Sequence, residues 1–347
     1  MKNLKCLTDT SIVCNWCYQD GNPLSDNDKS MFEAFMEKYV AYNRKRTVYR
    51  GTSNIKMYGM DINELSPNNG HLSTNTLSRF SEKLFMIGNK SFHFLSTSNT
   101  FKIEDVGDPV FEEIFNRLNR IITGQSRNRE CIINTFLSQN EEIKNFFSSE
   151  EKKKDFLRKT RDLKKEEKRL VKDCYIALLH AFHYDQFPNC YMLSTSKEFN
   201  VTQKFIKGKG YDKKGTEGIV IISWIPKSQK GKDIKSIDLN RANEKVAQLG
   251  FPTYQSSPYP DEKEICIKAG ILPHFMLGYI LTKEKKFVIN PYLISQIQNP
   301  ENIKSILNSG LEINQSHFKD ILNDTEYKIY FTSLGGDYRD HEGTTQP

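Results

Sequence analysis

Three strand-like segments, far apart in the chain, each carry polar residues among apolar ones. They are Thr47-Val48-Tyr49-Arg50-Gly51-Thr52, Tyr191-Met192-Leu193-Ser194-Thr195-Ser196 and Asp261-Glu262-Lys263-Glu264-Ile265-Cys266-Ile267. In order, they place an arginine on a strand, a Ser-Thr-Ser on a strand, and a Glu-x-Glu at the opening of a strand. Each segment alone is a weak signal. Their co-occurrence and order constrain the chain more than any other feature.

The expected secondary structure changes along the chain between these segments. Helical spacing of apolar residues over 31–40 predicts an N-terminal helix, and 52–90 reads as irregular around Ser66-Pro67-Asn68-Asn69-Gly70. Residues 104–187 carry apolar stripes at helical spacing, and short strand candidates punctuated by Gly and Pro follow from residue 190. The expected strands are 47–51, 92–98, 190–194, 218–224, 264–268, 274–281, 287–289 and 327–333.

These changes predict five parts of the chain. They are an N-terminal helical segment (1–46), the first part of a core (47–103), an inserted helical lobe (104–187), the remainder of the core (188–334) and a disordered polar tail (335–347). The helical stretch is also compatible with being simply part of the core.

Composition limits the partners. The chain has 347 residues and a net charge of +7, which raises nucleic-acid binding as a possibility. Residues 150–170, however, hold ten Lys/Arg against six Asp/Glu, and mixed charges of this kind are typical of a solvated helix face. We expect no nucleic-acid partner, no membrane span and, at the polar N-terminus, no cleavable signal peptide.

Cysteine and histidine spacing gives little sign of a metal. The seven cysteines are scattered, which predicts reduced thiols in a reducing compartment. Cys14 and Cys17 have zinc or redox spacing, but no second Cys/His pair follows at matching spacing. His180 and His183 lie at i and i+3 on an expected helix without an evident third ligand. We therefore expect no metal.

Together, the three segments resemble the mono-ADP-ribosyltransferases of the arginine–serine–glutamate class, which includes cholera toxin and the actin-modifying clostridial toxins. The resemblance covers residues 47–52 and roughly 190–281. It implies an α+β fold with two small, mainly antiparallel sheets around a cleft for NAD, the cosubstrate. It also implies that Arg50 grips the phosphates and ribose of NAD, that the Gly51 backbone meets the nicotinamide amide, and that Ser194 orients the catalytic glutamate. An arginine fork suits phosphate oxygens independently of any family.

The resemblance extends to the remaining site residues. It places Thr195 and Ser196 beside the NAD site as supports of the strand. Phe205, eleven residues after Ser194, corresponds to an aromatic that stacks on nicotinamide.

The Glu-x-Glu divides two roles between two carboxylates. By resemblance, Glu264 bonds the NAD ribose and stabilises the oxocarbenium, and Glu262 engages an arginine acceptor. Strand alternation would put both glutamates on one face. Tyr254 and Tyr259, in the preceding loop, are candidates to stack on the acceptor guanidinium.

A second Ser-Thr-Ser, Ser96-Thr97-Ser98, competes with Ser194. It lies closer in sequence to Arg50, which suits the compact toxins, but Phe101 follows too soon for the family's helix and aromatic. We expect Ser194 to belong to the site, which requires helices inserted before it.

The sequence therefore predicts transfer of ADP-ribose from NAD to a protein side chain, most naturally arginine, by a bacterial effector or toxin acting in the host cytosol. Two alternatives stay open. One is a NAD glycohydrolase, which uses water as acceptor. The other is a binding module in which the motifs are degenerate and no nicotinamide is released.

Overall fold

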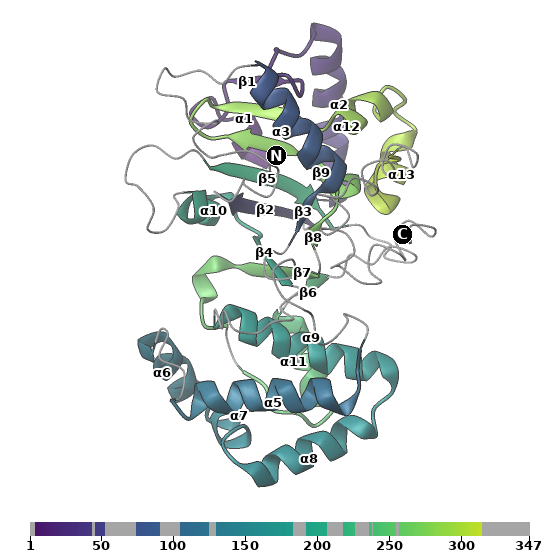
Figure 1. Ribbon diagram of the computed structural model, residues 1–347. Helices are drawn as coiled ribbons and strands as arrows, with labels where there is room; N and C mark the ends of the chain where they lie inside the picture. Colours follow the sequence, from purple (N-terminus) through teal and green to yellow (C-terminus); the bar gives the residue numbers. More distant parts are fainter. Residues whose placement is uncertain are drawn as a thin grey trace.

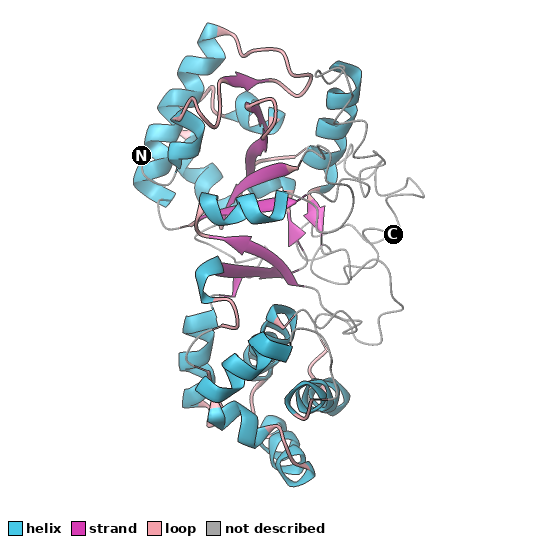
Figure 2. Ribbon diagram, turned by 90° about the vertical axis from the view of Figure 1, so that its left-hand side faces the viewer, coloured by secondary structure: helices cyan, strands magenta, loops and turns pink. Residues whose placement is uncertain are grey.

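The structure is a computed structural model of the chain. It describes residues 4–43, 46–52, 74–90, 105–124, 130–182, 192–206, 218–225, 236–237, 239–254, 257–268 and 270–313. These residues form a mixed α+β fold. Strands occupy the middle of the molecule, with helices above them and a helical lobe below (Figures 1 and 2).

Eight of the described strands form one mostly antiparallel sheet in the order β1-β10-β9-β5-β2-β4-β7-β6, and the pair β3-β8 forms a second. Among the described strand pairs, β1 and β10 alone run parallel. The strands are β1 (Asn15–Cys17), β2 (Thr47–Thr52), β3 (Asn89–Lys90), β4 (Met192–Ser196), β5 (Ile219–Trp224), β6 (Ser236–Ile237), β7 (Glu264–Lys268), β8 (Gly270–Ile271), β9 (Met276–Leu281) and β10 (Lys286–Ile289).

The eight-stranded sheet is nearly interrupted between β2 and β4. All six residues of β2 pair with β5, and all five residues of β4 pair with β7. Between β2 and β4 there is a single pair, Tyr49 with Ser196. We call β1-β10-β9-β5-β2 the long arm of the sheet and β4-β7-β6 the short arm. We describe the arms as parting where this pairing ends.

The long arm holds the main apolar core. Every residue of β5 and β9 is buried, which agrees with the continuous apolar run Ile219-Val220-Ile221-Ile222 of a strand covered on both faces. The helices that accompany this arm are α1 (Lys5–Thr8), α2 (Asp26–Asn43), α3 (Thr74–Ile87), α10 (Phe199–Ile206), α12 (Pro291–Gln296) and α13 (Asn302–Ser309), with the 3-10 turn η4 (Pro273–Phe275).

A helical lobe adjoins the short arm. Its helices are α5 (Asp108–Ile122), α6 (Glu130–Gln139), α7 (Glu141–Phe146), α8 (Glu150–Arg161), α9 (Lys165–Ala181) and α11 (Leu239–Gln248). Helix α9 contacts β4 and β6, and α11 contacts α9 and β7 (Figure 1). The lobe is thus built from the expected 104–187 insertion together with a helix from later in the chain.

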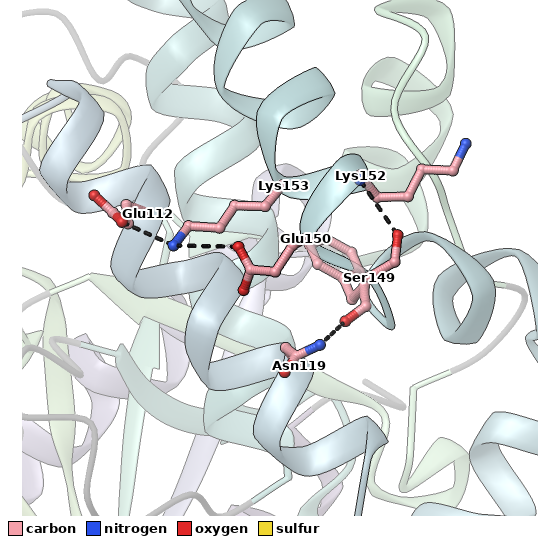
Figure 3. A network of polar contacts seen from close by, with 7 residues as sticks. Glu112, Asn119, Ser149, Glu150, Lys152 and Lys153 are labelled. Atoms are coloured by element: carbon pink, nitrogen blue, oxygen red, sulfur yellow. Dashed lines mark hydrogen bonds and ion pairs between the residues drawn. The ribbon is translucent and has the colours of Figure 1, made fainter.

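Polar contacts hold the far end of the lobe. The Ser149 hydroxyl accepts from the backbone N–H of Lys152 and caps α8, while Lys153 forms an ion pair with Glu112 of α5 at 2.8 Å (Figure 3). Asn119 of α5 donates to the Phe147 carbonyl at 2.7 Å. These contacts join α5, α7 and α8 around a cluster of buried phenylalanines.

Two sequence expectations need correction here. Residues 52–90 are not all irregular, because α3 spans Thr74–Ile87 with Leu77, Phe80 and Leu84 buried at helical spacing. The two packed sheets implied by the resemblance are not confirmed, since the described strands form one long sheet and a two-stranded one. The expected strands 92–98 and 327–333 and the tail 335–347 lie outside the described residues.

Candidate active site

Arg50, Ser194 and Glu264 come together where the two arms of the sheet part. The Arg50 guanidinium reaches from β2 and donates through Nη1 to the Ser194 carbonyl at 2.7 Å. Its Nε donates to Oδ1 of the buried Asn89 on β3, also at 2.7 Å. One arginine therefore connects β2, β3 and β4 at the point where strand pairing stops.

The register of β4 and β7 places Ser194 beside Glu264. Ser196 lies directly opposite Glu264, and Ser194 directly opposite Cys266. Paired residues of neighbouring strands share a face, so all four side chains lie on one side of the short arm. The side chains of Ser194 and Cys266 both hydrogen-bond Glu264.

The Glu264 carboxyl is buried, with 8% of its side chain exposed. Burial raises its pKa, and the hydrogen bonds from Ser194 and Cys266 and the charge of Arg50 oppose that rise. The site thus holds a carboxylate that is buried from water, with hydrogen-bond donors and a cation beside it. Such a carboxylate interacts strongly with a positive charge that forms nearby, because little water screens it.

His180 belongs to the same cluster, and sequence reasoning did not place it there. It lies in the last turn of α9, and its Nε2 is 2.6 Å from Ser194 Oγ and 3.8 Å from Glu264 Oε1. The sequence offered only a possible metal pair with His183, which lies outside the described residues. Nothing local in the sequence signals the contact, because it depends on how the lobe packs against β4.

The hydroxyls of Thr195 and Ser196 both bond to backbone groups, although Ser196 shares the face that carries Ser194 and Glu264. The buried Thr195 hydroxyl donates to the Ile265 carbonyl at 2.7 Å. The Ser196 hydroxyl donates to the Glu262 carbonyl at 2.8 Å and accepts from the Glu198 N–H. The hydrogen bonds to the Ile265 and Glu262 carbonyls hold the backbone on either side of Glu264.

The expectation that Glu262 lies on the strand with Glu264 is wrong. Glu262 ends a 3-10 turn, η3 (Pro260–Glu262), and β7 begins only at Glu264. Between them, Lys263 has φ of 47°, in the left-handed region. The half-buried Glu262 is therefore aimed by a turn, and strand alternation does not relate it to Glu264.

Gly51 serves helix packing. A Cβ added there would lie 2.2 Å from the Thr202 carbonyl oxygen of α10. Only a glycine lets α10 lie this close to β2. Phe205 is half-buried on that same helix, so the position of Phe205 depends on Gly51.

We expect Gly51→Ala to destabilise the protein by about 1–3 kcal/mol, the usual cost of overpacking. The added methyl meets backbone atoms of Thr202, which cannot turn away as a side chain can. Thermal denaturation would measure the loss. Gly107→Ala is the matched control for adding a methyl at a glycine, since a Cβ there would meet only Pro109 Cδ at an ordinary 3.5 Å. Equal losses at the two glycines would contradict the packing role.

Tyr254 does not suit the acceptor role expected from the sequence. It is 4% exposed and packs against Phe136 of α6 inside the lobe, near the Cys174 thiol. A ring enclosed in this way presents no face to an incoming guanidinium. Tyr259 is half-buried, next to η3, and remains a candidate.

The structure tests only some of the remaining sequence features. Ser96-Thr97-Ser98 lies outside the described residues, so its position relative to Arg50 and Glu264 is not described. Among the described residues there is no group of three or more His, Cys, Asp or Glu side chains able to hold a metal. Nor does the described part contain a helix long and apolar enough to cross a membrane.

The chain matches no protein-family model, no curated protein and no solved structure. An arginine suits the phosphates of a ligand, and a buried carboxylate held by a serine suits a transient cation.

Proposed function

We propose that the protein is a mono-ADP-ribosyltransferase that splits NAD and transfers ADP-ribose to a protein arginine, releasing nicotinamide. The observation that carries this proposal is the convergence of Arg50, Ser194 and Glu264 from β2, β4 and β7. These three residues are the ones that the sequence order singled out, and they are distant in the chain.

The proposed reaction breaks the bond between the nicotinamide nitrogen and C1 of the ribose. The bonding electron pair leaves with nicotinamide, which becomes neutral, and positive charge develops on the ribose. Glu264 faces that charge and stabilises it only as the bond breaks, which is how a carboxylate accelerates such a step. A guanidinium nitrogen of the acceptor then bonds to C1 and loses a proton.

In this proposal NAD lies across the opening between the two arms of the sheet. Arg50 binds the phosphates, Ser194 holds Glu264, and Phe205 on α10 stacks on nicotinamide. The long and short arms would correspond to the two-sheet core of the arginine–serine–glutamate class. The near-interruption at Tyr49 and Ser196 supports that correspondence, since only one residue pair joins the arms.

The acceptor side is proposed to lie at η3. Glu262 is half-buried there, its backbone held by Ser196, and Tyr259 is its neighbour. The six cysteines of the described part are free thiols, which suits a reducing compartment such as the cytosol of a host cell. A host protein is therefore the proposed substrate of a secreted effector.

A lysate experiment tests this function. The purified protein is incubated with host lysate and NAD labelled on its adenine, and labelled proteins are identified by mass spectrometry. We expect label on arginine, through an N-glycoside more stable to neutral hydroxylamine than a carboxylate ester. Label on another residue type would refute the arginine acceptor, and no label at all would refute the transferase.

We expect Glu262→Ala to separate the two halves of the reaction. Glu262 lies at the turn before β7, on the proposed acceptor side, so nicotinamide release should stay within about threefold of wild type while transfer to protein falls at least about tenfold. Parallel assays of free nicotinamide and labelled protein measure both. Asp261→Ala, an exposed carboxylate of the same turn, is the control and should change neither. Equal loss of both activities would move Glu262 into the NAD site.

A further inference from the structure

We propose that His180 is a positioning residue, supplied by the helical lobe, that directs the Ser194 hydroxyl proton to Glu264. This inference rests on the proposed function for its catalytic consequence, but its geometry stands apart from it. The observation is that a residue of α9 reaches across to β4, with Nε2 at 2.6 Å from Ser194 Oγ.

Counting protons assigns the roles. A serine hydroxyl has one proton and an ionised carboxylate only accepts, so the Ser194 O–H must donate to Glu264 when the two are bonded. Ser194 Oγ can then only accept from His180. The Nε2 of His180 must carry a proton, as the Nε2–H tautomer or as the imidazolium.

The direct path from His180 to Glu264 is too long to act as a hydrogen bond. Nε2 lies 3.8 Å from Oε1, beyond the range of an N–H···O bond. His180 therefore acts through Ser194. Without the histidine donor, the rotation of the Ser194 hydroxyl is less constrained, and its hydrogen bond to Glu264 weakens.

Packing of the lobe fixes where His180 lies. Helix α9 is almost fully buried over Val171–Leu179 and contacts α5, α11, β4 and β6. The carbonyl dipoles at the C-terminal end of a helix also favour a donor or a positive charge there. The lobe thus holds one end of the chain His180–Ser194–Glu264, and packing changes in the lobe are transmitted to the site.

Substitutions at His180 test this through activity. Gln places an amide N–H near the position of Nε2, whereas Leu has similar bulk and no donor. We expect His180→Leu to lower kcat for nicotinamide release about tenfold with the KM for NAD little changed, and His180→Gln to restore most of it, because the hydrogen bond matters mainly in the transition state. Equal losses in Gln and Leu would overturn the donor role.

A double-variant comparison separates positioning from a merely structural effect. In a Ser194→Ala background, His180→Leu should cause no further fall in kcat, since its effect passes through the serine. A further tenfold fall would show that His180 acts by another route and would overturn the proposal.

A spectroscopic measurement keeps the inference independent of the proposed function. Imidazole ¹⁵N shifts of wild type, with His180 assigned from the missing signal in His180→Gln, report which ring nitrogen carries the proton. We expect Nε2 protonated in wild type and a shifted tautomer balance in Ser194→Ala. An Nδ1–H tautomer in wild type would overturn the positioning role, whereas absent nicotinamide release with Nε2 protonated would refute only the enzyme.

Discussion

Replacing Glu264 with glutamine is expected to lower nicotinamide release from NAD at least about a hundredfold. Glutamine keeps the size of the side chain and one acceptor oxygen, but it replaces the other oxygen with an NH2 donor and removes the negative charge that faces the developing cation. Transfer to protein should fall by the same factor, because it follows the same bond cleavage. Chromatography measures the steady-state rate of nicotinamide release by wild type and by Glu264→Gln under the same conditions.

The stability of the same variant shows whether the loss is chemical. Burial raises the pKa of Glu264, so folding favours the protonated carboxyl. The stabilising contribution of this group to the free energy of unfolding is therefore fully present below its unfolded-state pKa, about 4.3, and is lost as the pH rises through its folded-state pKa. Glu264→Gln should therefore unfold at the same or a higher temperature than wild type at neutral pH, with the difference shrinking toward acid pH.

Acid should also reduce wild-type activity. Protonation removes the charge of Glu264, and the raised pKa puts that loss at a higher pH than for an exposed glutamate.

Glu284→Gln is the matched control for Glu264→Gln. Glu284 is a similarly covered glutamate, 9% exposed and paired with Lys286, between β9 and β10. Loss of activity in the control, or near-normal turnover in a folded Glu264→Gln protein, would contradict the role.

Replacing Arg50 with lysine is expected to lower activity by at least about a hundredfold even though the charge is retained. The guanidinium makes two directed hydrogen bonds at once, to Asn89 and to the Ser194 carbonyl. A lysine has a single ammonium group and cannot reproduce that planar fork. The KM for NAD should rise as well, since phosphate binding depends on the same group.

Arg117→Lys is the control for the arginine substitution. Arg117 lies on α5 in the lobe and pairs with Glu113 at 2.6 Å, so its replacement should leave nicotinamide release unchanged. Wild-type kinetics in a folded Arg50→Lys protein would show that Arg50 serves only to join the strands.

The strands that carry the site could be predicted because they are locally distinctive. Apolar, β-branched residues mark 264–268 and 218–224, and the structure has strands at Glu264–Lys268 and Ile219–Trp224. The helical lobe could also be predicted, because Val110, Ile114 and Leu118 recur at helical spacing. Where apolar residues follow one clear period, the local sequence is enough to predict a helix or a strand.

What escaped prediction depends on packing between distant parts. Strand alternation does not extend to Glu262, because Lys263 adopts a left-handed conformation, which is uncommon for a residue with a side chain. Tyr254 was expected at the surface, but α6 and α9 cover it. The contact of His180 with Ser194 follows from the way the lobe meets β4, which no spacing encodes.

The most direct test of the account is whether the purified wild-type protein releases nicotinamide from NAD while Glu264→Gln does not. Proton NMR of the reaction follows NAD and free nicotinamide in one sample over time, without any acceptor protein. We expect steady formation of nicotinamide by wild type and at least about a hundredfold slower formation by the variant. Intact NAD with folded wild-type protein, or equal rates in the two proteins, would contradict it.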